Sequence, residues 1–181
     1  LRAYRQAATD NLRLSLAAPP FAEGSPFAKA RGTRYPIFQG PMTRVSDVSG
    51  FFVKVAEGGG LPFAALALLS GERTEALLSS TAAEMNRRPW GVGLLGFMGP
   101  KVLAPQFEAI ARHRPQFAIV AGARIDQIQT LECMGIRSFA HVSSASMLGH
   151  YLDAGVTRFV IEGRERGGHV GPLASFVLGR A

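Results

Sequence analysis

The residue types best suited to chemistry lie together near the end of this 181-residue chain, in the segment EGRERGGHVG at positions 162–171. Four glycines in ten residues leave backbone N–H groups accessible, and His169 among them can accept or donate a proton near neutral pH. On spacing alone, a flexible connection with an incidental histidine explains the segment equally well. The spacing therefore makes His169 a candidate catalytic residue but does not assign that role to it.

A second candidate segment follows the apolar run Tyr35 to Gln39 and contains Gly40, Pro41 and Met42. Glycine and proline allow a close, rigid turn of the backbone, which suits an approach to a flat ring. His141 ends another apolar run and could line the same region. The remaining histidines fall on or after helical segments and are interpreted as surface or packing residues. No spacing typical of metal ligands is present, so we expect no metal site.

Six short apolar runs predict strands, and the segments between them show apolar residues at helical spacing. The runs are Tyr35 to Gln39, Leu61 to Leu66, Trp90 to Leu95, Phe117 to Ala121, Ser138 to Val142 and Arg158 to Glu162. The expected helices are Asp47 to Glu57, Glu72 to Arg87, Pro105 to Arg112, Asp126 to Met134 and Ser144 to Ala154. Gly58, Gly135 and Gly155 follow three of them, where a left-handed residue can end a helix.

Apolar strands that alternate with single helices predict a parallel sheet covered by helices, either open or closed into a barrel. An open dinucleotide-binding sheet needs a glycine-rich phosphate loop after its first strand. The cluster Gly58 to Gly60 precedes a strand instead. We therefore predict an α/β fold of the TIM (β/α)8 barrel type, truncated after about six of the eight β/α units.

Composition predicts a folded domain, because 47% of the residues are hydrophobic and only 18% are charged. Residues 1–33 are interpreted as a lead-in or linker that is internal to a longer protein, and residues 34–181 as the N-terminal part of the barrel. The single Cys133 excludes an internal disulfide and fits a reducing cytoplasm. The arginines behind the net charge of +7 are scattered, and no apolar stretch is long enough to span a bilayer. Neither nucleic acid nor membrane is an expected partner.

Three motifs resemble the nitronate monooxygenase family, once called 2-nitropropane dioxygenases, which includes FMN-dependent enoyl-acyl-carrier-protein reductases. They are YPIFQGPM at 35–42, EGGGLPF at 57–63 and EGRERGGHVG at 162–171. The resemblance implies a barrel that holds FMN over the strand ends, with His169 facing the substrate. It implies cofactor contacts at Gly40, Pro41, Met42, Gly167 and Gly168. Gly122 is a weaker candidate, since a turn glycine explains it equally well.

Two positions distinguish this chain within the resemblance. Gly93 stands where many members of the family carry asparagine, which leaves the flavin contact at Gly93 in question although the position remains a cofactor candidate. Glu162 resembles the enoyl reductase branch, whereas nitronate-oxidising members tend to have glutamine. Glu162 is therefore a further cofactor candidate and favours a reductase that uses NAD(P)H as electron donor.

A looser resemblance, carried by Leu14 to Phe21 and by the segment after Gly171, links the chain to the nitropropane-dioxygenase-like domain of large bacterial polyketide synthases. It implies a small-molecule or acyl-carrier-bound substrate, and other polyketide synthase domains as partners. Two functions stay open. The first is an FMN-dependent oxidoreductase serving polyketide or fatty-acid synthesis, in which His169 positions or protonates the substrate. The second is a truncated, inactive structural or interaction domain, since strands seven and eight, which often hold a ligand phosphate, are absent.

Overall fold

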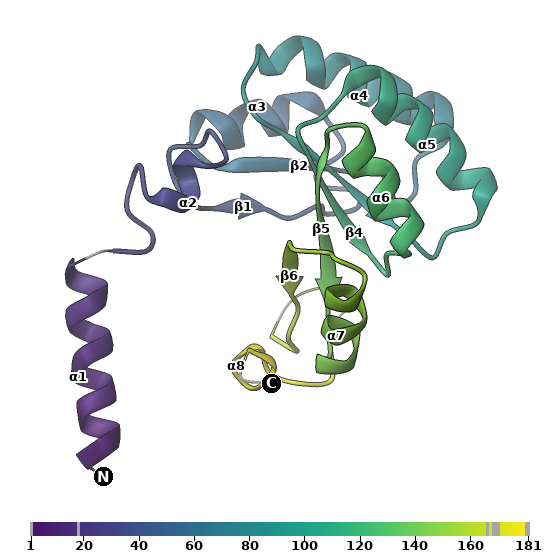
Figure 1. Ribbon diagram of the computed structural model, residues 1–181. Helices are drawn as coiled ribbons and strands as arrows, with labels where there is room; N and C mark the ends of the chain where they lie inside the picture. The colour runs from purple at the N-terminus through teal and green to yellow at the C-terminus, as the bar shows by residue number, and fades with distance from the viewer. Residues whose placement is uncertain (1, 18, 166, 168–170, 180–181) are drawn as a thin grey trace.

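A computed structural model describes residues 2–17, 19–165, 167 and 171–179 (Figure 1). Its strands are β1 (Phe38–Gln39), β2 (Leu61–Ala65), β3 (Gly91–Leu95), β4 (Phe117–Ala121), β5 (Arg137–Val142) and β6 (Phe159–Ile161). Its helices are α1 (Arg2–Ala17), α2 (Pro26–Lys29), α3 (Ser49–Glu57), α4 (Gly71–Met85), α5 (Pro100–His113), α6 (Ile125–Cys133), α7 (Ala145–Asp153) and α8 (Ser175–Leu178).

The six strands form one sheet in the order β1-β2-β3-β4-β5-β6, and every neighbouring pair is parallel. Figure 1 shows the sheet curling, with α3 to α7 along its outer side. Parallel neighbours need such crossover helices, which is why one helix stands between successive strands from β1 to β6. Among the described residues β1 and β6 each pair with one strand only, so the sheet is a half-barrel. The predicted truncated barrel of the TIM type is confirmed.

The strands bury side chains on both faces. Between sheet and helices lies the larger apolar cluster, which includes Val92, Val120 and Ala140. On the inner, concave face lies a smaller cluster made of Leu61, Phe63, Phe117, Ile119 and Phe139, with Phe38 and Val160 packed against it. Alternate residues of a strand point to opposite faces. The inner cluster therefore fills the half-barrel directly beneath the residues at the strand ends.

The predicted strands are confirmed, although β1 starts three residues later than its apolar run, at Phe38. Tyr35 N still donates a 2.9 Å hydrogen bond to the Gly59 carbonyl, so the start of the apolar run lies beside the segment that leads into β2. The predicted start of the third helix at Pro105 is wrong, because α5 begins at Pro100. Gly99 is its extended N-cap residue and Pro100 occupies the first turn, where proline is well tolerated, while Pro105 is accommodated inside the helix.

Two of the three expected left-handed glycines are confirmed, since Gly135 and Gly155 both have φ of +79°. The assignment of Gly58 is wrong. Gly58 continues the helical conformation with φ of −65°, and the left-handed residue is Gly59 with φ of +91°. A side chain at Gly59 would also meet Arg34 at 2.8 Å, so this turn tolerates glycine alone.

The first 33 residues contain two different structures. Helix α1 has no buried residue and stands away from the sheet in Figure 1. The segment around α2 packs against the domain, since Ala28 is fully buried and the Phe27 and Phe38 rings are 5.5 Å apart. The guanidinium of Arg137 donates a 3.0 Å hydrogen bond to the Ala30 carbonyl. No helix in the described part of the chain is long and apolar enough to cross a membrane.

Glu132, the next-to-last residue of α6, ties this helix to the entrances of β5 and β6. Its Oε1 accepts hydrogen bonds from Ser138 N (2.7 Å), Ser138 Oγ (2.6 Å) and Arg158 Nη1 (3.0 Å). Burial is the largest single influence and raises the pKa of Glu132, but the hydrogen bonds from Ser138 and Arg158 together outweigh it. The pKa is therefore held below its usual value.

We expect Glu132→Gln to lower the free energy of unfolding by about 1 kcal/mol at pH 7, since charge-assisted hydrogen bonds are lost from a partly exposed site. A depressed pKa stabilises the fold above the unfolded-state value, about 4.3 for glutamate, and this contribution disappears as the pH falls through the folded-state pKa. Urea unfolding of both proteins at pH 7 and at pH 3 checks this. A difference that stays constant between these pH values would contradict it.

Candidate active site at the carboxyl ends of the strands

Two adjoining hollows lie at the carboxyl ends of the strands. The first is lined by Pro41, Thr43, Ala65, Ala67, Gly93, Leu94, Leu95, Ile119, Ala121 and His141. The second is lined by Phe97, Ala121, Gly122, His141, Ser143, Met147 and Glu162. Ala121 and His141 border both hollows, so the two form one continuous region. In parallel β/α barrels this end of the strands carries the active site.

The loop after β1 is fixed to its neighbours by polar contacts. The side-chain Oε1 of Gln39 accepts a 3.2 Å hydrogen bond from Phe63 N, and its Nε2 donates to the Gly40 carbonyl. Met42 N donates a 2.7 Å hydrogen bond to the hydroxyl of Ser46, a fully buried residue. The Ser46 carbonyl in turn accepts from Ala65 N at 2.8 Å. These contacts hold the predicted Gly40-Pro41-Met42 turn above the sheet end.

Gly93 and Pro41, which are predicted cofactor residues on different elements, come together in the structure. A Cβ atom on Gly93 would collide with the Pro41 ring, so this ring occupies the space that a side chain at position 93 would need. The same contact gives a structural reason for glycine where many members of the resembled family carry asparagine. No such atom stands near Gly40, where an added Cβ would meet nothing within 4 Å. Gly40 therefore leaves an open surface beside the first hollow.

The loops after β3 and β4 meet at Gly122, the weaker of the predicted cofactor residues. Gly122 has φ of +61°, and a side chain there would meet the Phe97 ring at 2.8 Å. The buried Gln127 secures this region, because its Nε2 donates a 2.9 Å hydrogen bond to the Gly96 carbonyl. Tyr151 Oη donates at 2.9 Å to the Ala123 carbonyl. The backbone around Gly122 is thus positioned by the helices behind it.

His141 and Glu162 are a buried pair of ionisable residues in the site. The Nδ1 atom of His141 lies 2.9 Å from Oε2 of Glu162, and the two side chains are 7% and 6% exposed. His141 is on β5, two residues after Phe139, and both point to the inner face of the sheet. Glu162 directly follows β6, and its N–H donates a 2.8 Å hydrogen bond to the Val142 carbonyl. An imidazole and a carboxylate from neighbouring strands are thus buried together.

The glycine-rich segment starts and ends beside this pair. Arg164 N donates a 2.9 Å hydrogen bond to the Leu173 carbonyl, and Glu165 Oε2 accepts from Ser175 N at 3.0 Å and from Ser175 Oγ at 2.9 Å. A Cβ on Gly171 would meet the Glu162 carbonyl at 2.6 Å. Gly167 is exposed. His169 and Gly168 lie outside the described residues, and their predicted roles stay predictions.

The pair formed by His141 and Glu162 is the feature that sequence reasoning missed. Glu162 was expected to contact the cofactor with no partner fixed for it, and His141 was expected only to line the barrel mouth. The alternation of side chains between the two faces of β5 could have predicted the position of His141. Phe139 is an inner residue, so His141 two positions later faces inward as well, and the parallel register places β6 beside it through the pairing of His141 with Val160.

Two larger hollows lie away from the strand ends. One opens between α5 and α6 and is lined mainly by Leu103, Ala104, Phe107, Thr130 and Met134. The other lies between α6 and the segment before β6 and includes Glu132 and Arg158. Both are grooves on the outer helical layer. The strand ends are the better candidate, because they combine close backbone approaches with a buried ionisable pair.

A scan of protein-family models found no match, and neither did a search of curated proteins. Solved structures do match. FabK from Thermotoga maritima superposes with a TM-score of 0.74 at 21% identity, covering 84% of this chain and 48% of that one. Nitroalkane oxidase from Streptomyces ansochromogenes gives a TM-score of 0.69 at 16% identity, covering 80% and 50%.

The enoyl reductase domain of MlnA, from the macrolactin biosynthesis cluster of Bacillus amyloliquefaciens, gives a TM-score of 0.62 at 15% identity. The match covers 80% of this chain and 43% of the MlnA domain structure. The chain therefore spans about half the length of the solved proteins that it matches. At these identities the likeness concerns the fold. The chain is a TIM-type half-barrel of the kind found in FabK, nitroalkane oxidase and the MlnA enoyl reductase domain, in agreement with the resemblance carried by its motifs.

Proposed function

We propose that the chain forms the first part of an FMN-dependent oxidoreductase whose flavin binds across the carboxyl ends of β1 to β6. The observation that carries the proposal is the pair of adjoining hollows there, bordered by the Pro41 and Gly93 contact, by Gly122 and by the buried His141 and Glu162. The shared fold with nitroalkane oxidase and an enoyl reductase domain supports the same class of reaction.

The described residues fit a flat, largely apolar ring. Gly40 offers an open backbone surface, and the first hollow is bordered mainly by small or apolar side chains, among them Pro41, Ala65 and Ala121. Gly40, Pro41, Met42, Gly93 and Gly122 would hold the ring, with Gly167 and Gly168 of the glycine-rich segment as further candidates. FMN, when bound, carries electrons between donor and substrate. The protein's part is to orient the substrate, exclude water and handle protons.

Within this class we favour the enoyl reductase reaction, with NAD(P)H as the donor and an acyl-carrier-bound substrate within a polyketide or fatty-acid synthesis system. Glu162 supports this choice through its resemblance to the reductase branch. His169 is proposed to position or protonate the substrate. The nitronate-oxidising reaction is the alternative within the same class.

Anaerobic mixing decides between the two reactions. The FMN-loaded protein is combined with NADPH in one cell and with a nitronate in another, and the oxidised flavin absorbance band is followed. We expect NADPH to bleach the band and the nitronate to leave it. If only the nitronate bleaches the band, the proposed reaction is nitronate oxidation instead.

A second candidate function is an inactive structural or interaction domain of a polyketide synthase. The observation in its favour is that, among the described residues, β1 and β6 each pair with a single strand, which leaves sheet edges available to another polypeptide. Failure of FMN to bind, together with failure of both reagents, would favour this function over the oxidoreductase.

A further inference from the structure

The buried pair of His141 and Glu162 is not needed to hold the sheet together. Strands β5 and β6 are already joined by their parallel backbone ladder, and Glu162 N–H extends it to the Val142 carbonyl. Burying an imidazole and a carboxylate costs desolvation free energy, and apolar residues of similar volume often hold such a position equally well or better. The pair therefore calls for a role beyond packing.

The contact between the two side chains favours one protonation form of the imidazole. The His141 Nδ1 atom lies 2.9 Å from Glu162 Oε2. An ionised carboxylate only accepts hydrogen bonds, so an ionised Glu162 favours the ring form that carries its proton on Nδ1. The other ring nitrogen, Nε2, then accepts a proton when the ring is neutral and donates one when the ring is charged. In this ring form, Nε2 is the atom through which His141 would exchange a proton with a bound molecule.

The location of the ring puts it within reach of a bound molecule. His141 borders both hollows, and below it the inner face is closed by the aromatic cluster that contains Phe139. A molecule that enters either hollow therefore meets the imidazole as a polar group on an otherwise mainly apolar floor. A desolvated site of this kind strengthens hydrogen bonds and proton transfer.

We propose that His141 is a second catalytic histidine of the site, which exchanges a proton with a carbon atom next to an electron-withdrawing group of the substrate, and that Glu162 is its positioning residue. The inference rests on the proposed function and adds to it a proton-handling group distinct from His169. In the direction of proton removal, the substrate C–H bond breaks and its electron pair stays on the substrate, while the proton forms a bond to Nε2. In the reverse direction Nε2 returns the proton to carbon.

Hydrogen exchange in a small carbon acid tests this step without any flavin. Nitroethane is the probe, and the loss of its CH2 signal in D2O is followed by 1H NMR with and without the chain. We expect the chain to accelerate exchange above the buffer rate and His141→Gln to reduce this acceleration about a hundredfold, the lower end of the range for general acid–base catalysis. Equal acceleration by the wild type and His141→Gln, or no acceleration by the wild type, would overturn the proposal.

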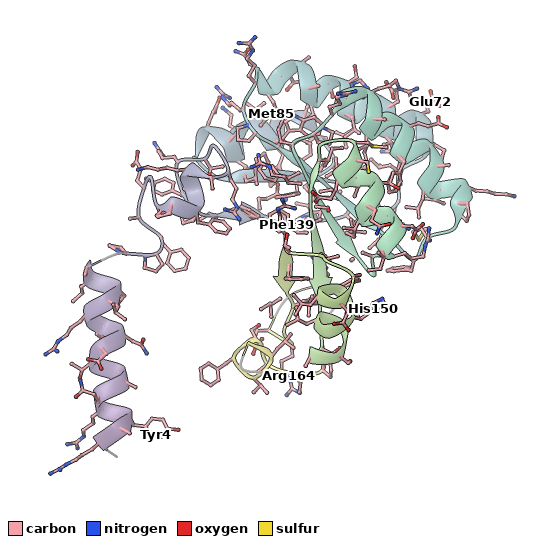
Figure 2. All side chains as sticks on the ribbon, viewed as in Figure 1. Tyr4, Glu72, Met85, Phe139, His150 and Arg164 are labelled. Atoms are coloured by element: carbon pink, nitrogen blue, oxygen red, sulfur yellow. The ribbon has the colours of Figure 1, made fainter. Side chains whose placement is uncertain are left out.

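Matched variants separate the histidines. His150 is an exposed residue of α7 (Figure 2), so His150→Gln is expected to exchange nitroethane as the wild type does. His169→Ala is expected to retain acceleration that His141→Gln loses. If the loss occurs in His169→Ala alone, His141 is not the base. Because no flavin is present, these outcomes do not depend on FMN binding or reduction, and failure of the proposed function shows itself separately in the anaerobic mixing.

The positioning role of Glu162 has its own readout in the 15N chemical shifts of the His141 ring. We expect the wild type to show the Nδ1–H form of the neutral ring. Glu162→Gln, which keeps the shape but can donate as well as accept, is expected to change the tautomer balance and to slow nitroethane exchange severalfold. An unchanged tautomer with an unchanged exchange rate would show that Glu162 does not position the ring.

Discussion

Phe139→Ala is expected to lower the free energy of unfolding by about 3–5 kcal/mol, the range for removing a buried aromatic side chain. Phe139, labelled in Figure 2, is 5% exposed and packs in the inner cluster. Its ring centroid lies 5.6 Å from that of Phe38 and 6.3 Å from that of Phe117. Truncation leaves a cavity that the strands on either side cannot easily close. Denaturant unfolding followed by circular dichroism measures the loss.

The matched control is Phe176→Ala, since Phe176 is 77% exposed. This variant should unfold within about 0.5 kcal/mol of the wild type. If Phe139→Ala loses no more stability than Phe176→Ala, the inner face of the half-barrel is not a packed core. The strand-end site would then lack the rigid floor on which its geometry depends.

Gly93→Ala is expected to destabilise the chain by about 3 kcal/mol, the upper end of the range for overpacking. The added methyl group would collide with Pro41, whose ring cannot rotate away, and Gly93 itself is buried on β3. Relief requires the Gly40-Pro41-Met42 turn to move off the sheet end. We therefore expect a loss of flavin affinity together with the loss of stability, measured by thermal unfolding and by FMN titration.

Gly40→Ala separates the two effects, because its Cβ would meet no atom of the protein within 4 Å. We expect its stability to stay within about 0.5 kcal/mol of the wild type while its FMN affinity falls, since the methyl group would stand on the surface that the ring is proposed to cover. Unchanged FMN affinity in Gly40→Ala would argue against a flavin contact at this turn. Wild-type stability in Gly93→Ala would show that Pro41 moves freely.

Local patterns predicted the elements well, because each strand is a compact apolar run and each helix buries one face. Errors arose where proline and glycine chemistry competes with periodicity. Pro105 suggested a helix start, yet Gly99 and Pro100 together make the better N-terminus five residues earlier. Gly58 and Gly59 both follow the same helix, and only the turn geometry shows that Gly59 is the left-handed residue.

The sequence predicted where the site lies better than it predicted which residues meet there. Strand ends in a parallel barrel converge, which places Gly40, Gly93 and Gly122 around one region. The pairing of His141 with Glu162 depends on the inward parity of β5 and on the register between β5 and β6. Neither residue indicates the other through sequence spacing, since they are far apart along the chain. Close approaches such as that of Pro41 to Gly93 likewise exist only in three dimensions.

The most direct test of the flavin site is a titration of the 15N-labelled chain with FMN, followed through its glycine amide signals, which reports weak and tight binding alike. The predicted result is that the signals of Gly40, Gly93 and Gly122 shift with FMN concentration. Gly59, Gly135 and Gly155 lie in turns just before the amino ends of β2, β5 and β6, and their signals should not shift. Shifts confined to these three turns, or no shift in any glycine, would contradict a flavin site at the carboxyl ends of the strands.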